Sequence, residues 1–402
     1  MAGDPHELLA DDWMQWRGPL GNNIAQSGQN VLTEWDERTN VIWQAEVPGR
    51  GHSSPIVVGE LIVLTSADEQ SQQQGVFGFD RATGARKWGT VISQGGFPKT
   101  HQKNTHASST ACSDGRHIYA TFCHHEKVEA VALDLKGNVI WKNIVGGFAP
   151  RQYEYGYAAS PTLYSGKLIV SGDSDTVAWV KALDTETGRI VWQQDRPRKL
   201  NWSSPIVAQT GGRKQLLLSG LNMISSYDPQ TGQPLWSQPC LTMATCGTVV
   251  WDDQVVYASG GYPDKETVAV SADGRGGILW KNSVKCYEQS MLIHDGHLYA
   301  VDDGGVAYCW EARSGTEKWK YRLRGPVSAS PVLVGDVIIA PNESGTTYVF
   351  RANPNRFEAI AQNQLGTESF ATPTVVDSKI YLRVAAGQGD ARRETLFAIG
   401  TR

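Results

Sequence analysis

The stretch Leu183-Asp184-Thr185-Glu186-Thr187-Gly188-Arg189-Ile190-Val191-Trp192 decides the fold, because it recurs along the chain. Other copies end at Trp88, Trp141, Trp236, Trp280 and Trp319, and a degraded copy that begins at Phe350 lacks the tryptophan. The Asp and Thr side chains of such a segment can bond turn amides, while Gly takes a positive φ. Each copy therefore predicts a turn that leads into a strand carrying the tryptophan.

A second motif alternates with the first, and it consists of small residues, often Ser-Ser-Pro, that open an apolar strand. Its eight copies are Ser53-Ser54-Pro55, Ser108-Ser109-Thr110, Ala159-Ser160-Pro161, Ser203-Ser204-Pro205, Thr245-Cys246-Gly247, Gln289-Ser290-Met291, Ala329-Ser330-Pro331 and Ala371-Thr372-Pro373. Neighbouring copies lie roughly 40 to 55 residues apart, which with strand patterns throughout is typical of four-stranded propeller blades. Small residues suit the crowded region near a central axis.

The two motifs together predict an all-β, eight-bladed β-propeller. The last unit ends near Ile399 without an outer strand, and Val41–Val47 carries an unused tryptophan, Trp43. We therefore expect residues 41–47 to close the ring as the outer strand of the last blade, which removes exposed sheet edges. The whole chain, 1–402, is then a single domain, with an N-terminal arm over 1–40 and blades over 48–402.

The tryptophans of the first motif are expected to dock each blade onto the next, largely buried between blades. They are Trp43, Trp88, Trp141, Trp192, Trp236, Trp280 and Trp319. The segment from Phe350 to Ile360, which lacks a tryptophan, should form the least regular boundary. The Asp of each turn and the repeated serines are expected to be structural, so no catalytic residue is predicted.

Composition narrows the classes of partner. The 402 residues carry a formal charge of −4 with no long basic block, which argues against nucleic acid as a partner. No stretch approaches the roughly 20 apolar residues of a transmembrane helix. The opening Met1-Ala2-Gly3-Asp4-Pro5 has no apolar core of a signal peptide.

The Asp-x-x-Thr-Gly-x-x-x-Trp repeat resembles the tryptophan-docking motif of quinoprotein propellers, and the chain resembles the PQQ-like (pyrroloquinoline-quinone-like) β-propeller repeat family from about Trp13 onward. The opening Trp13-Met14-Gln15-Trp16-Arg17-Gly18-Pro19 is similar to that of exported, planctomycete-type members. The length and blade number also resemble the BamB-type scaffold. This resemblance implies a periplasmic or exported location, with the cytoplasm as an alternative.

Two function classes follow from the resemblance. PQQ-dependent alcohol dehydrogenases have an adjacent Cys–Cys disulfide, a calcium ion and long insertions, whereas the cysteines here (Cys112, Cys123, Cys240, Cys246, Cys286 and Cys309) include no adjacent pair. We therefore expect a non-catalytic binding or assembly scaffold without a cofactor. The alternative is a degenerate or active quinoprotein dehydrogenase that binds PQQ with calcium, or a sugar, at the channel mouth.

Histidines and cysteines are candidates for metal or disulfide sites. His101, His106, His124, His125 and Glu126 cluster in the second unit, but no cysteine pair completes a zinc site, so no metal is predicted. Cys240, Cys246 and Cys286 could form a disulfide in an exported protein or remain buried thiols, and the sequence leaves both open.

The residues just before the small-residue motif should ring one mouth of the central channel. They are Arg50, His52, His106, Tyr157, Trp202, Met243, Glu288, Ser328, Glu368 and Phe370. Of these, His52, His106, Tyr157, Trp202, Glu288 and Glu368 are the predicted ligand-binding residues. Aromatic rings and acidic groups favour a small neutral or cationic ligand there, and otherwise the partner is expected to be another protein.

Overall fold

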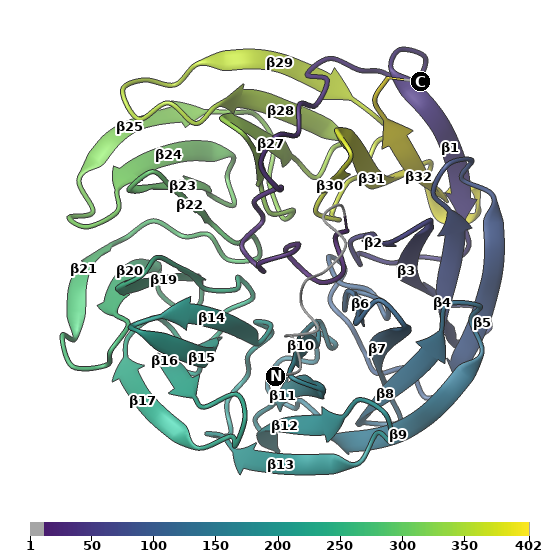
Figure 1. The fold of residues 1–402 in the computed structure, drawn as a ribbon, viewed down its shortest axis with the longest axis horizontal. Coiled ribbons are helices and arrows are strands. Elements are labelled where there is room, and N and C mark those ends of the chain that lie inside the picture. Colours follow the sequence, from purple (N-terminus) through teal and green to yellow (C-terminus); the bar gives the residue numbers. More distant parts are fainter. Residues whose placement is uncertain (1–11, 402) are drawn as a thin grey trace, which may run out of the picture.

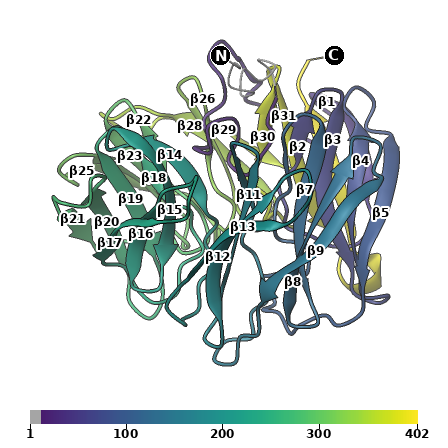
Figure 2. The same cartoon turned by 60° about the horizontal axis from the view of Figure 1, so that its bottom comes forward.

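The computed structural model describes residues 12–401, which form eight four-stranded antiparallel sheets arranged around a central axis (Figures 1 and 2). This confirms the predicted all-β, eight-bladed propeller. The single helical element among the described residues is a 3-10 turn, η1 (Gly389–Ala391). No helix in this part of the chain has the length and apolar character to cross a membrane.

The first four blades follow one another in sequence, each running from an inner to an outer strand. Blade 1 contains β2 (Ile56–Val58), β3 (Leu61–Asp68), β4 (Gln73–Asp80) and β5 (Arg86–Gln94), and blade 2 contains β6 (Cys112–Ser113), β7 (His117–His124), β8 (Lys127–Asp134) and β9 (Val139–Gly147). Blade 3 contains β10 (Thr162–Tyr164), β11 (Lys167–Asp173), β12 (Ala178–Asp184) and β13 (Ile190–Asp195), and blade 4 contains β14 (Ile206–Thr210), β15 (Arg213–Gly220), β16 (Met223–Tyr227) and β17 (Pro234–Pro239).

The remaining blades complete the ring, and the last one combines both ends of the chain. Blade 5 contains β18 (Val250–Trp251), β19 (Val255–Gly260), β20 (Glu266–Ser271) and β21 (Ile278–Asn282), and blade 6 contains β22 (Leu292–His294), β23 (His297–Val301), β24 (Val306–Glu311) and β25 (Glu317–Arg322). Blade 7 contains β26 (Val332–Val334), β27 (Val337–Pro341), β28 (Thr346–Arg351) and β29 (Ala359–Gln364), and blade 8 contains β30 (Thr374–Val376), β31 (Lys379–Ala386), β32 (Arg393–Ile399) and β1 (Val41–Val47).

Strand β1 closes the ring as expected. It pairs antiparallel with β32, so that Trp43 lies opposite Ala398 and Val47 opposite Glu394. Both ends of the chain therefore contribute to one sheet, and β32 has a partner on each side. An open ring would leave the backbone groups of β32 unpaired at an edge, which is a common origin of aggregation.

The Asp-x-x-Thr-Gly turn forms as its sequence predicts. In blade 3, Asp184 Oδ1 accepts bonds from the Thr187 amide at 2.9 Å and from the Thr187 hydroxyl at 2.7 Å, and Gly188 has φ +69°. The Trp141 ring of blade 2 lies directly on Gly188, where a Cβ atom would be 2.6 Å from a ring carbon. Glycine is thus required twice, for the turn and for the close approach of the ring.

The other tryptophans repeat this contact. Trp43, Trp88, Trp192, Trp236 and Trp280 lie against Gly84, Gly137, Gly232, Gly274 and Gly315 of the following blades. Trp192 is buried, and Trp43, Trp88, Trp141, Trp236, Trp280 and Trp319 are partly buried. The Trp88 ring, for example, lies against Gly78 of its own blade as well as Gly137 of the next. At Trp319 a phenyl ring, Phe357, packs beside the indole at 5.6 Å.

The second motif forms a ring of hydrogen bonds around the axis, which we call the hydroxyl belt. Its members are Ser54, Thr110, Ser160, Ser204, Thr248, Ser290, Ser330 and Thr372. Seven backbone N–H groups of the belt each donate to the hydroxyl of the next blade at 2.9–3.1 Å. In two blades the predicted alignment of the motif was wrong. Thr110 and Thr248 occupy the repeated position there, and not Ser109 and Cys246.

The N-terminal arm closes the channel at the end where the inner strands finish. Trp13 exchanges backbone hydrogen bonds with Val57 at 3.1 and 3.0 Å, and the Ala25 amide donates to the Leu333 carbonyl at 2.8 Å. The Arg17 guanidinium is buried inside, where burial lowers its pKa to about 9. In Figure 1 the arm crosses the centre of the ring. The stretch Met1–Pro5, on which the signal-peptide expectation rests, lies outside the described residues.

Candidate functional site

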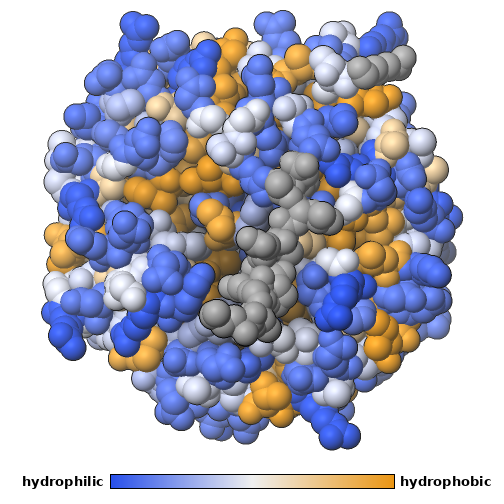
Figure 3. Space-filling view, viewed as in Figure 1, coloured by the Kyte–Doolittle hydropathy of each residue, from blue (hydrophilic) through white to orange (hydrophobic). Residues whose placement is uncertain are grey.

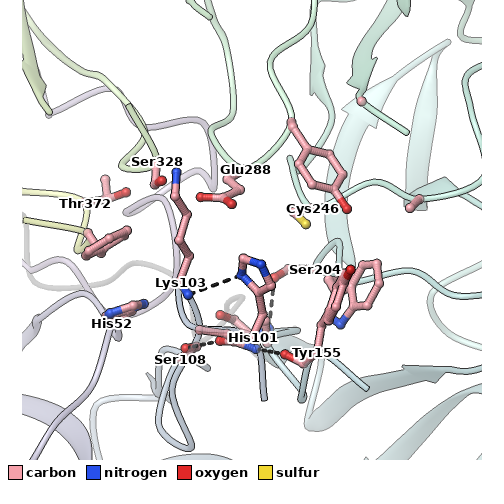
Figure 4. Close-up of a pocket in the computed structure, with 18 of the residues that line it drawn as sticks. His52, His101, Lys103, Ser108, Tyr155, Ser204, Cys246, Glu288, Ser328 and Thr372 are labelled. Atoms are coloured by element: carbon pink, nitrogen blue, oxygen red, sulfur yellow. Dashed lines mark hydrogen bonds between the residues drawn. The ribbon is translucent and has the colours of Figure 1, made fainter. Parts of the chain in front are cut away.

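A cavity of about 390 Å³ opens at the end of the channel opposite the arm (Figure 4). The loops that precede the inner strands form its wall, together with two long connections, residues 95–111 between β5 and β6 and residues 148–161 between β9 and β10. Its volume lies in the range of small-molecule sites. The cavity therefore has the position that the sequence predicts for a channel mouth.

Five aromatic side chains form one side of the cavity, and we call them the aromatic wall: Tyr153, Tyr155, Trp202, Tyr262 and Tyr287. Tyr155 stacks on Trp202 with ring centroids 5.9 Å apart and planes inclined by 24°. The Trp202 indole N–H donates to the Gly156 carbonyl at 2.8 Å, which fixes the ring against the loop of Tyr155. The Tyr153 hydroxyl donates to the Tyr262 hydroxyl at 3.1 Å, so the wall is linked across blades.

His52 and Phe370 form a second aromatic surface. Their rings stack with centroids 4.4 Å apart and planes inclined by 12°. In the view of Figure 4, His52 and Thr372 lie on one side of the opening, and Tyr155 and Cys246 on the other. Burial lowers the pKa of His52 well below its usual value, and the charges of Arg50, Arg383 and Arg392 lower it further. His52 is therefore a neutral ring at pH 7, and its Nε2 atom is buried without a partner among residues 12–401.

The two lysines of the cavity lining are both paired with carboxylates. Lys103 Nζ lies 2.7 Å from Glu343 Oε1, and Lys285 Nζ lies 2.9 Å from Asp303 Oδ2, so both cations have carboxylate partners. Glu288 projects into the same space, and burial raises the pKa of its carboxyl. The lining thus has no cation left over to neutralise an anionic ligand, among the residues that the structure describes.

The floor of the cavity consists of Trp16 and part of the hydroxyl belt. Trp16 donates its indole N–H to Thr248 Oγ1 at 3.1 Å, in the one position where the belt lacks a link. The belt hydroxyls that line the floor are Thr110, Ser160, Ser204 and Thr372. Each hydroxyl oxygen accepts a hydrogen bond from a backbone N–H. The hydrogen of each hydroxyl remains available to donate into the cavity.

Comparison with known proteins assigns the family. The family model described as outer membrane protein assembly factor BamB matches residues 20–179, 75–321 and 264–354, which span most of the propeller. The chain belongs to the BamB family. Its similarity to BamB of Bordetella pertussis is 23% identity, over 93% of this chain and 95% of that protein. It is also 22% identical to a polyvinylalcohol dehydrogenase of Pseudomonas sp over 85% of this chain, but it spans only 58% of that enzyme.

Solved structures share the fold of this BamB-family chain. BamB from Moraxella catarrhalis superimposes with a TM-score of 0.62 at 15% identity, covering 89% of this chain and 96% of that one. A europium-containing methanol dehydrogenase superimposes with a TM-score of 0.67 at 12% identity, covering 98% of each chain. At these identities the likeness shows the fold alone, which scaffolds and dehydrogenases have in common.

The structure brings three of the six predicted ligand-binding residues of this BamB-family chain together. His52, Trp202 and Glu288 line the cavity, and so do Ser328 and Phe370 from the wider ring of mouth residues. The other three predicted residues, His106, Tyr157 and Glu368, lie outside its lining. That any of the six binds a ligand stays a prediction.

The three residues outside the lining have structural partners instead. His106 stacks on Phe97 at 4.1 Å and places Nε2 2.9 Å from the Pro98 carbonyl. The buried Tyr157 donates its hydroxyl to the Ser171 carbonyl at 2.9 Å. Glu368 forms an ion pair with Arg392. A residue that directly precedes the small-residue motif has its backbone near the channel mouth. Its place in the sequence does not determine where its side chain points.

Sequence reasoning missed the residues that the long loops and the arm supply. Lys103, Tyr153 and Tyr155 come from residues 95–111 and 148–161, and Trp16 comes from the arm. The wider spacing of the first repeats was the signal for these loops, since a longer repeat must carry extra residues outside its four strands. Nothing comparable in the sequence indicated that Trp16 would reach the floor.

The histidine cluster and the cysteines are also placed by the structure. His124 and His125 contact each other at 3.0 Å between their Nδ1 atoms, but within residues 12–401 no three His, Cys, Asp or Glu side chains gather as metal ligands. All six cysteines of this range are free thiols. Burial raises the pKa of Cys123 and of Cys240 to about 12, which keeps these thiols protonated at neutral pH.

Proposed function

We propose that the protein is a non-catalytic scaffold of the bacterial cell envelope that holds other proteins in an assembly, as the name of the BamB family describes for its members. The match of the family model over residues 20–354, together with near-complete mutual coverage of a BamB relative, carries this proposal. The same relatives support the envelope location, periplasmic or exported, that is part of this proposal.

The outer wall of the propeller supplies a surface suited to a protein partner. Val139, Ile140 and Ile144 on β9, with Ile190 and Val191 on β13, are each 41–49% exposed. We call these five residues the outer-wall patch. Strand β9 is joined to the turn that precedes β13, because Asn143 Nδ2 donates to the Gly188 carbonyl at 2.8 Å. On the face shown in Figure 3, apolar side chains reach the surface at several places between hydrophilic ones. Exposed aliphatic side chains on the outer strands of neighbouring blades favour protein contact.

The competing function is that of a quinoprotein dehydrogenase, which is supported by the similarity to a polyvinylalcohol dehydrogenase. PQQ is a polycarboxylate, and calcium requires several oxygen ligands. The lining offers two lysines that already pair with carboxylates, a buried Glu288, and no adjacent cysteines. Since no three His, Cys, Asp or Glu side chains of residues 12–401 form a metal-ligand group, these residues do not fit PQQ with calcium.

Two measurements on the purified chain and its host test the proposal. A photo-crosslinking residue at Ile140 or Val191 should join one envelope protein in living cells, whereas the same residue at Lys320 on β25 should not. The purified chain, incubated with PQQ and calcium, should oxidise no alcohol or aldose above a control without protein. If no crosslink forms in cells and the purified chain shows calcium-dependent turnover, the protein belongs to the dehydrogenase class instead.

A further inference from the structure

We propose that the cavity at the channel mouth binds a neutral saccharide of one or two sugar rings. A sugar ring has an apolar face of C–H groups and an edge of hydroxyl groups, and it carries no net charge. The cavity matches each of these three properties with a different set of residues. This inference concerns a site separate from the outer-wall patch and does not depend on the partner proposed there.

The first match is between the C–H face of a sugar and the aromatic wall. The face of an aromatic ring carries partial negative charge, and the C–H groups of a sugar carry partial positive charge, so the two stack favourably. Tyr155 is 38% exposed, although it stacks on the buried Trp202. The exposed part of its ring is thus held in place by Trp202 and by the rings of Tyr153 and His101, at centroid distances of 5.4 and 4.8 Å, which limits the entropy lost on binding. The stacked pair of His52 and Phe370 offers a second flat surface within the same cavity.

The second match is between sugar hydroxyls and the floor. The hydroxyl oxygens of Thr110, Ser160, Ser204 and Thr372 accept from the belt amides, and no hydrogen bond within residues 12–401 uses their hydroxyl hydrogens. They form an arc of hydrogen-bond donors at the base of the cavity. Glu288 supplies an acceptor on the wall, and His52 Nε2 is a buried polar atom without a partner. A ligand rich in hydroxyls can satisfy donors and acceptors of both kinds, since each hydroxyl is both.

The third match is the absence of net charge on the ligand. Lys103 and Lys285 are neutralised by Glu343 and Asp303, and the neutral state of His52 adds no cation. An anionic ligand would find no free cation in the described lining to balance its charge, which is costly in a partly buried site. A quaternary ammonium ion would meet two lysine side chains in the same lining. A neutral polyol avoids both penalties.

The experiment uses the full chain and three disaccharide probes, cellobiose, maltose and N,N′-diacetylchitobiose, with PQQ as an anionic comparison. Isothermal titration should detect at least one disaccharide with a Kd at or below about 10 mM. Tyr155→Ala should weaken that affinity at least about tenfold, and Glu288→Gln at least about threefold. Tyr321→Ala, an exposed ring on β25 far from the cavity, is the matched control and should leave the affinity unchanged.

Each other result overturns the inference. Absence of binding by all three disaccharides at that concentration rejects a saccharide site. Binding that survives Tyr155→Ala and Glu288→Gln places the sugar elsewhere on the molecule. Tight binding of PQQ without binding of any disaccharide shows that the cavity selects an anion. Because Tyr155 lies on a loop and is partly exposed, its variant should fold, and a thermal melt within about 2 °C of the parent verifies this.

Discussion

The backbone N–H of Thr372 in blade 8 donates to the hydroxyl of Ser54 in blade 1 at 3.1 Å, although 318 residues separate them in sequence. This bond joins the two ends of the hydroxyl belt, beside the sheet in which β1 and β32 join the two ends of the chain. The serine or threonine of the repeated motif is therefore more than a small residue near the axis. Its hydroxyl satisfies a buried amide of the preceding blade, which glycine or alanine could not do.

Ser54→Ala should destabilise the protein by about 1–3 kcal/mol, because it leaves the buried Thr372 amide without an acceptor. Ser54→Thr is the matched control, since threonine occupies the same belt position in blades 2, 5 and 8. Urea unfolding followed by tryptophan fluorescence measures both free energies of unfolding. If Ser54→Ala and Ser54→Thr unfold at the same urea concentration as the parent, the belt does not stabilise the ring.

Trp192→Ala should cost about 3–5 kcal/mol of stability, as other truncations of buried aromatic residues do. The Trp192 ring lies on Gly232 of blade 4 and is 9% exposed. The neighbouring Val191, 49% exposed on the same strand, is the control, and Val191→Ala should change stability by less than about 0.5 kcal/mol. The half-buried Trp88 and Trp141 should show losses between these two. Equal effects of the Trp192 and Val191 changes would contradict a docking role for the tryptophans.

The repeats predicted the blade number and the closing strand because both follow from local chemistry. A turn such as Asp184 to Gly188 needs particular residues at fixed positions. Trp43 precedes the first blade, and the last blade was the one that lacked an outer strand. The site was harder, since its side chains come from segments outside the repeat. Tyr155 and Lys103 lie on long loops, whose paths depend on packing against several blades, and His106 and Tyr157 turn into that packing instead of the cavity. In blades 2 and 5 the belt residues are Thr110 and Thr248 and not the predicted Ser109 and Cys246. The hydrogen-bond geometry, and not the likeness of the sequences, determines which residue belongs to the belt.

His52 should make the protein less stable in acid. Burial depresses its folded-state pKa below the unfolded value of about 6.5, so the unfolded chain binds a proton first as the pH falls. The stability that its neutral state contributes is present above pH 6.5 and is lost below it, by at most about 1.4 kcal/mol per pH unit. His52→Phe keeps the stack on Phe370 and removes the titration. The melting temperature of His52→Phe relative to the parent should therefore rise between about pH 7 and pH 5. A constant difference over this range would show that the pKa of His52 in the folded protein is not lowered relative to the unfolded chain.

Glu288 should have the opposite effect on pH dependence. Burial raises the pKa of its folded-state carboxyl, and nearby Glu343 and Asp303 add to this, while a hydrogen bond from Ser328 and the charge of Lys103 oppose it. The folded protein therefore holds the proton to a higher pH than the unfolded chain does. Full stability from this group is present below the unfolded pKa of about 4.5, and it decreases as the pH rises through the folded pKa.

Glu288→Gln keeps the shape of the side chain and removes its titration, so it isolates this contribution. The melting temperature of the variant relative to the parent should increase as the pH rises from about 4.5 to 7, and it should then level off. If the melting temperatures of the variant and the parent differ by a constant amount over this range, the pKa of Glu288 is not raised in the folded protein, and the group is ionised there. It would then face the cavity as a charge, and a cationic ligand would replace the neutral sugar as the better match.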